Sequence, residues 1–224
     1  MVAGATPALV ALFSSLPAEA LATTDGSSSF ILFSALAAYV HYASLLIAAI
    51  SLSVERFTIR PGMTEEENNI ITIADTLYGI SAVTIIASGY SRITQYGKGW
   101  DFYKHEPLFW VKLTLFGVMG AVSLFPTTMI IKRAIQRQTT GSYPPMSEKL
   151  AKRFTSLVNT ELLALLSIPL FATTMSRGVL YSEAIPWQLE AIPLPIAVLG
   201  FGYKYMNEAL QWKEDEVVVT TEAD

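Results

Sequence analysis

Four long stretches of mainly apolar residues constrain this chain more than any other feature of its sequence. They cover residues 30–54, 70–88, 108–131 and 154–175. A helix that crosses the hydrocarbon core of a bilayer needs about 20 such residues. None of the stretches alternates apolar and polar residues as a transmembrane β-strand does. The sequence therefore predicts an all-α, polytopic membrane protein with a bundle of four transmembrane helices.

The composition agrees with this class. Of the 224 residues, 15% are charged and 52% are hydrophobic, whereas soluble domains contain about 25% charged residues. Cysteine is absent, which excludes disulfides, thiolate metal sites and iron–sulfur clusters. The net charge of −4 comes without a basic stripe, and this argues against a nucleic-acid partner. We expect the partners to be the lipid bilayer and other membrane proteins of a larger complex.

The remaining residues predict shorter elements at both ends, so the chain has three regions. Residues 1–29 are similar to the apolar core and small-residue end of an export or lumen signal, or they form a short interfacial helix. Residues 30–178 form the four-helix transmembrane domain. Residues 179–224 contain an acidic tail and a short stretch, 192–206, that includes Pro193 and Pro195. We interpret 192–206 as an interfacial or re-entrant helix.

The distribution of basic residues predicts the orientation. We name the membrane face reached after the first span side A and the opposite face side B. Side A has eight basic residues and side B has four: Arg56, Arg60, Lys132, Arg133, Arg137, Lys149, Lys152 and Arg153 on side A, and Arg92, Lys98, Lys104 and Arg177 on side B. By the positive-inside rule, side A is cytoplasmic or stromal, and the N-terminus lies outside or in a lumen.

Local signals mark where the helices begin. Thr64, with Glu67 three residues later, predicts a capping box at the start of the second helix. Ser147 is the expected N-cap of the fourth helix. Pro126 and Pro169 fall inside the third and fourth spans, where each is expected to kink its helix.

Acidic residues inside the spans form the first candidate site. Charges at such positions usually face the interior of a bundle and mark function or assembly. The helical rise places Asp75 about 8 Å and Glu161 about 10 Å in from side A, while Glu55 and Arg56 lie at the membrane edge on that side. One interpretation is a proton- or cation-handling site. The other is a structural network in which hydroxyl groups or Arg56 satisfy the carboxylates.

Basic and aromatic residues near side B form the second candidate site. Arg92, Lys112 and Arg177 could together bind a lipid headgroup or the propionates of a porphyrin. Trp and Tyr are also common at membrane interfaces, where lysine side chains can snorkel to the headgroups. An aromatic belt with basic anchors is therefore the alternative.

His41 is the third candidate, because it lies about 16 Å from side B, near the midplane. Met119 lies at the same depth, and a His–Met pair across a bundle can ligate haem iron, here haem b. His41 could also ligate the magnesium of a chlorophyll, or form hydrogen bonds to Asp75, Tyr78 or Ser123. No second histidine lies within the spans, and no further metal site is predicted.

Four segments of the sequence resemble a known membrane-protein family, catalogued as domain of unknown function 2214. These are "HYASLLIAAISLSVER", "DTLYGISAVTIIASGYSR", "FYKHEPLFWVKLTLFGVMGAVSLFPTT" and "ELLALLSIPLFATTMSRG". The resemblance covers about residues 35–178. The shared positions are His41, Glu55, Arg56, Asp75, Gly79, Gly89, Arg92, Tyr103, Phe109, Lys112, Ser123, Pro126, Thr127, Glu161 and Arg177.

The resemblance implies a bacterial, cyanobacterial or plastid lineage and little about activity. A looser similarity extends to the four-helix, haem-associated protoporphyrinogen oxidase of bacteria and to copper-resistance membrane proteins. Both have a histidine in an early helix and a Trp–x–Lys start to a later one, as at Trp110 and Lys112 here.

These observations leave three functional hypotheses. The first is an accessory or assembly protein of an energy-transducing membrane, such as the thylakoid membrane of a plastid. The second is a haem- or porphyrin-binding redox protein centred on His41. The third is a proton- or cation-coupled transporter that uses Asp75 and Glu161. The motifs of soluble enzymes are absent, which favours a non-enzymatic role.

Overall fold

The computed structural model describes residues 26–213, and every regular element in that part of the chain is a helix. The five long helices are α3 (Gly26–Thr58), α4 (Glu65–Thr94), α6 (Pro107–Thr140), α7 (Glu148–Ser176) and α9 (Pro193–Gln211). Two short helices, α5 (Trp100–Tyr103) and α8 (Trp187–Ala191), lie between them. Four helices, α3, α4, α6 and α7, are long and apolar enough to cross a membrane. The prediction of an all-α membrane protein with a four-helix bundle is confirmed.

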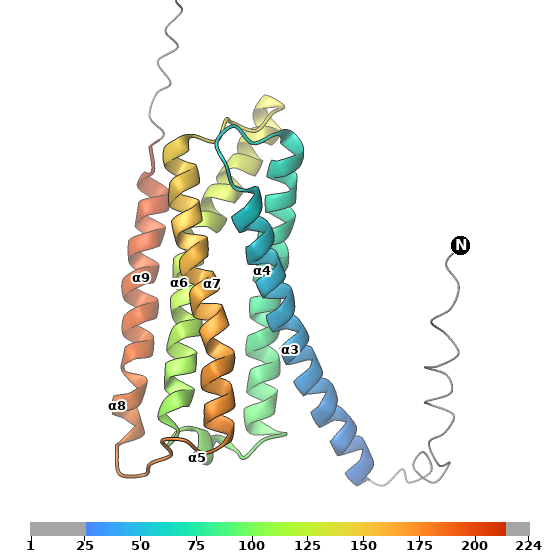
Figure 1. Ribbon diagram of the computed structural model, residues 1–224, viewed down its shortest axis with the longest axis vertical. Helices are drawn as coiled ribbons and strands as arrows, with labels where there is room; N and C mark the ends of the chain where they lie inside the picture. The colour runs from blue at the N-terminus through green and yellow to red at the C-terminus, as the bar shows by residue number, and fades with distance from the viewer. Residues whose placement is uncertain (1–25, 214–224) are drawn as a thin grey trace, which may run out of the picture.

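The long helices lie side by side, with their loops at two opposite ends (Figure 1). The α3–α4 and α6–α7 loops share one end, which corresponds to side A. The loops that contain α5 and α8 share the other end, side B. Packing joins α3 to α4 and α7, and α6 to α7 and α9. The bundle therefore brings α3, α4 and α7 together in the half that faces side A.

The helix starts follow the predicted chemistry. The Thr64 hydroxyl accepts a hydrogen bond from the Glu67 amide at 3.2 Å, and the Glu67 carboxylate accepts one from the Thr64 amide at 2.8 Å. The Ser147 hydroxyl accepts from the Leu150 amide at 3.1 Å. Both predicted caps are confirmed. Pro126 and Pro169 lie inside helices that continue past them.

The core is concentrated in the half of the bundle that faces side A. Phe125, Leu150, Phe154 and Leu52 are fully buried there. In contrast, only 6% of the apolar window of α3 is buried, against 33–39% for the other three spans. The first half of α3 leans away from the bundle (Figure 1). It therefore presents apolar side chains to the surroundings rather than to the core.

The α9 helix stands upright against α6 and extends from the side-B end to the side-A end (Figure 1). Near its C-terminal end, Glu208 accepts two hydrogen bonds from Arg153 of α7, at 2.6 and 2.7 Å. Lys132 of α6 donates to the carbonyl of Ala209 at 2.6 Å. Residues 192–206, predicted as an interfacial or re-entrant helix, thus lie mostly within α9, which runs alongside α6. The signal-like stretch before residue 26 and the acidic tail after residue 213 lie outside the described residues.

Candidate functional site

Three buried carboxylates lie together in the half of the bundle that faces side A. Glu55 of α3, Asp75 of α4 and Glu161 of α7 are 1%, 9% and 1% exposed. Glu161 interacts electrostatically with both of the others, and Asp75 with Glu55. We call these three residues the acidic cluster. The depth argument placed Asp75 and Glu161 at one level, and the bundle brings them together.

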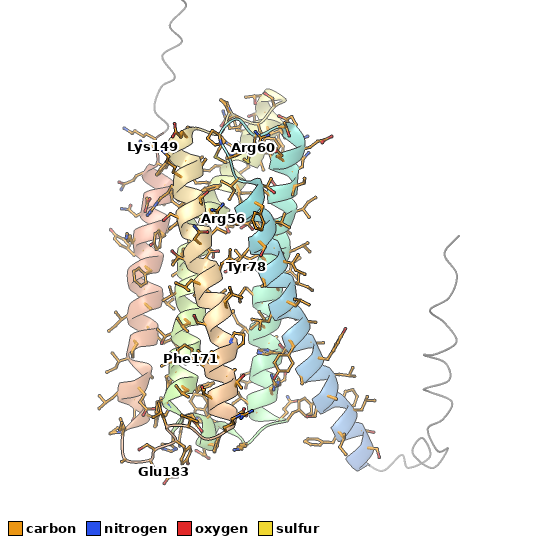
Figure 2. The ribbon with its side chains drawn as sticks, in the orientation of Figure 1. Arg56, Arg60, Tyr78, Lys149, Phe171 and Glu183 are labelled. Carbon is orange, nitrogen blue, oxygen red and sulfur yellow. The ribbon has the colours of Figure 1, made fainter. Side chains whose placement is uncertain are left out.

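Hydroxyl groups surround the acidic cluster. The Thr127 hydroxyl of α6 donates a hydrogen bond of 2.6 Å to Asp75 Oδ1. Tyr78, one turn from Asp75 on α4, interacts electrostatically with all three carboxylates and forms a hydrogen bond with Ser123. Figure 2 labels Tyr78 among the helices of the bundle, below Arg56. Within the described part of the chain, one carboxylate oxygen each of Glu55 and Glu161 is buried without a hydrogen-bond partner.

Arg56 does not neutralise the cluster. Its Nε donates to Asn159 Oδ1 at 2.7 Å, at an exposed position. The structural network in which Arg56 pairs with the carboxylates is therefore not formed, although the Thr127 hydroxyl does bind Asp75. Three uncompensated negative charges in a low-dielectric interior would each cost several kcal/mol. Such a cluster is stable when it holds protons or a bound cation.

His41 lies in the α3–α4 interface, closer to side B than the acidic cluster. Its Nδ1 is 3.0 Å from the hydroxyl oxygen of Ser88, and the backbone of Ile85 also forms a hydrogen bond with the imidazole, so its partners are on α4 and are not Asp75, Tyr78 or Ser123. The imidazole packs on the backbone of Gly89, where an added Cβ would lie 3.2 Å from His41 Cε1. Sequence depth alone did not reveal this pair. The small residues "ASG" ahead of Tyr90 are the signal that a side chain approaches closely there.

Two of the three predicted basic residues meet near His41. Arg92 and Lys112 both interact electrostatically with it. Arg92 lies over the ring of Tyr42, 5.0 Å from its centroid, and Lys112 lies 5.5 Å from that of Phe109. Arg177 is exposed at the C-cap of α7 and takes no part in the charge interactions of His41 or Lys112. The predicted anionic site is thus reduced to Arg92 and Lys112.

Haem ligation by His41 stays a prediction. Met119, its proposed partner, is 2% exposed and packs in the apolar core. A ligand site of porphyrin size needs a cleft of at least about 300 Å³. One cavity of about 430 Å³ is open on the outer face of α3, and a second, of about 10 Å³, lies near Asn68 and Arg133. Neither is lined by His41 or Met119.

A further acidic pair at side B was not predicted. Glu106 is 0% exposed, and both carboxylate oxygens of Glu106 and of Glu190 are buried without a hydrogen-bond partner in the described residues. Burial raises the pKa of both carboxyl groups. Beside them, Trp110 stacks on Trp187 with the ring centroids 5.7 Å apart. The sequence signal was Glu106 directly before Pro107, a residue typical of the first helical position.

Comparison with known proteins gives one match. No curated protein and no solved structure matches the chain. A family model described as "Predicted membrane protein (DUF2214)" matches residues 33–180, well over half of the chain. The match contains the acidic cluster, His41, Arg92 and Lys112. The chain therefore belongs to the DUF2214 family of predicted membrane proteins.

Proposed function

We propose that this integral membrane protein takes up and releases protons at the acidic cluster, as the proton-binding site of a proton-coupled transporter. The observation that carries the proposal is the meeting of Glu55, Asp75 and Glu161, from three helices, with no basic partner among residues 26–213. Acidic residues within a membrane bundle are the usual components of proton relays.

The surroundings of the cluster support protons over a metal ion. Hard divalent cations take six or more oxygen ligands in a defined geometry. In residues 26–213, no group of three acidic, histidine or cysteine side chains is arranged to hold a metal ion. The hydroxyl groups of Thr127 and Tyr78 lie beside the carboxylates instead, and Ser123 forms a hydrogen bond with Tyr78. A hydroxyl both donates and accepts hydrogen bonds, so it can serve either form of a carboxyl group.

The test is proton flux in proteoliposomes. The purified protein is reconstituted with a pH-sensitive dye inside, and a potassium diffusion potential drives protons inward. We expect Asp75→Asn and Glu161→Gln to lower the protein-dependent flux by about 100-fold, the usual weight of a proton-transfer group. Glu66→Gln is the matched control, because Glu66 is an exposed carboxylate in the first turn of α4. Wild-type flux in folded Asp75→Asn and Glu161→Gln would refute the proposal.

A second candidate is the accessory or assembly role in an energy-transducing membrane such as the thylakoid. Its support is the first half of α3, which carries exposed apolar side chains, among them Leu32, Phe33, Leu36 and Tyr39. A neighbouring membrane protein could pack there. Gentle solubilisation from the native membrane should then keep the protein in a larger complex. Recovery as a monomer alone would count against this role.

A further inference from the structure

Most of the buried polar side chains lie along one route through the membrane. Ten polar or charged residues are buried in the described part of the chain, and seven of them belong to this route: Ser44, Ser51, Glu55, Asp75, Ser81, Ser88 and Glu161. The acidic cluster lies at one end and the His41–Ser88 pair at the other. We call the residues between them, Ser44, Ser51, Tyr78 and Ser81, the polar track.

Helix geometry places the polar track in the α3–α4 interface. On α3, Ser44 follows His41 by three residues, and Glu55 follows Ser51 by four. These spacings keep side chains on one face of a helix. On α4, Tyr78 and Ser81 follow Asp75 at intervals of three, so these side chains also share one face of their helix.

Two interactions between α3 and α4 fix the register of these helices. Glu55 is fourteen positions after His41, and Ser88 is thirteen positions after Asp75, each a rise of about 20 Å. The two helices pack antiparallel against each other (Figure 1). The His41–Ser88 contact at one end and the Glu55–Asp75 interaction at the other therefore set the same register. The buried hydroxyls of both helices must lie between these two points.

Two groups on α4 form hydrogen bonds with His41: the hydroxyl of Ser88 and the backbone of Ile85. Ser88 has a single hydroxyl hydrogen, which it donates to the carbonyl of Thr84 at 2.6 Å. Ser88 must then accept the hydrogen bond from His41 Nδ1–H at 3.0 Å. In a neutral imidazole with a proton on Nδ1, Nε2 carries a lone pair and can accept a second proton. The charged groups that face His41 are Arg92 of α4 and Lys112 of α6.

We propose that His41 is the station through which the acidic cluster exchanges protons with side B, along the polar track. The proposal rests on the function proposed above. A proton from water on side A binds a carboxylate of the cluster. Each hydroxyl of the track, with water between them, accepts one proton and passes one on. His41 Nε2 takes up the last proton and passes it to water that fills the remaining ~16 Å to side B, so the only bonds that form and break are O–H and N–H.

Two measurements on the same proteoliposomes test this route. The first is proton flux under the imposed potential. The second is the infrared signal of the protonated carboxyl group that is lost in Asp75→Asn, which reports the acidic cluster itself. We expect His41→Gln and Ser81→Ala to lower the flux by about 100-fold, the lower limit for a lost proton-transfer group, while the carboxyl signal stays. Thr76→Val is the matched control, since Thr76 is exposed on α4 and bonds only its own helix.

The outcomes separate the route from the function. Wild-type flux in both His41→Gln and Ser81→Ala, with flux lost in Asp75→Asn, would overturn the route and leave the acidic cluster as the proton site. Wild-type flux in Asp75→Asn would overturn both proposals. Should His41→Gln fail to fold, Ser81→Ala decides alone, because it removes only one hydroxyl from the track.

Discussion

At the scale of single residues, Thr127 is the hydroxyl that holds Asp75 in the acidic cluster. Its 2.6 Å hydrogen bond to Asp75 crosses from α6 to α4. We expect Thr127→Val to lower the free energy of unfolding in detergent by about 1–3 kcal/mol, because the replacement leaves a buried carboxyl oxygen without its partner. Thermal unfolding measures this change. Thr128→Val is the control, since the Thr128 hydroxyl contacts only the sulfur of Met206, at 3.9 Å. Equal stability of the two variants would contradict the prediction.

Gly89 is the residue on which the position of His41 depends. A Cβ there would lie 3.2 Å from the imidazole, whereas nothing lies within 4 Å of a Cβ at Gly79 on the same helix. Replacing a helical glycine by alanine stabilises a helix by about 1 kcal/mol. We expect Gly79→Ala to show this gain in thermal unfolding and Gly89→Ala to lose it, because the ring must move away from Ser88. A gain of the same size in both variants would show that His41 adapts without cost.

Single residues also show which features of the site could be predicted from the sequence and which could not. Helical rise was sufficient to place Asp75 and Glu161 at one level, because depth depends only on position in the span. It could not identify Ser88 as the partner of His41, since that pairing depends on the rotation and register of two helices. For the same reason, Met119 shares the predicted depth of His41 but packs in the core.

At the scale of elements, the acidic pair Glu106 and Glu190 connects α8 to the start of α6. Burial raises the pKa of both carboxyl groups; the charge of Glu190 raises that of Glu106 further, whereas Lys98 opposes the shift. His105 opposes the shift of Glu190, and Tyr181 interacts with Glu106. The protonated forms therefore suit the folded state. Their contribution to stability is complete below the ordinary carboxyl pKa of about 4.3 and is lost as the pH rises through the raised pKa.

The predicted loss of stability with rising pH can be tested on α8. We expect amide hydrogen exchange in α8, corrected for its intrinsic pH dependence, to become faster relative to the α6 core as the pH rises above the ordinary carboxyl range. Glu190→Gln should remove most of that dependence, because the amide stays neutral. Glu183→Gln is the control, since Glu183 is exposed in the loop before α8 (Figure 2). A pH dependence that survives in Glu190→Gln would exclude the acidic pair as its cause.

The elements themselves follow closely from the sequence. Each predicted span lies inside a longer helix, as residues 70–88 lie within α4. The thickness of the bilayer sets the length of the apolar stretch, but the helix can continue beyond the membrane. The caps at Thr64 and Ser147 were predictable since capping depends on local spacing. The acidic pair was not, because it joins Glu106 to a residue more than eighty positions later.

At the scale of the whole molecule, the two ends of the bundle differ in their number of basic residues. Arg60 and Lys149 mark the end with the α3–α4 and α6–α7 loops, and Glu183 marks the other (Figure 2). The excess of basic residues at the first end predicts that it faces the cytoplasm or stroma. The upright α9 then carries the chain to that same end, where Glu208 binds Arg153.

The absence of cysteine from the chain makes this orientation directly measurable with single introduced thiols. We place them in the α6–α7 loop (Ser142→Cys), in the loop before α8 (Glu183→Cys) and after α9 (Lys213→Cys), and label sealed vesicles of known orientation with a membrane-impermeant maleimide. Ser142→Cys should react from the cytoplasmic or stromal side and Glu183→Cys from the opposite side. Lys213→Cys should be labelled from the same side as Ser142→Cys, because α9 ends beside Arg153. Labelling of Lys213→Cys from the Glu183 side would instead show that residues 192–206 re-enter or lie on that face, and reversed labelling of the first two would invert the whole bundle.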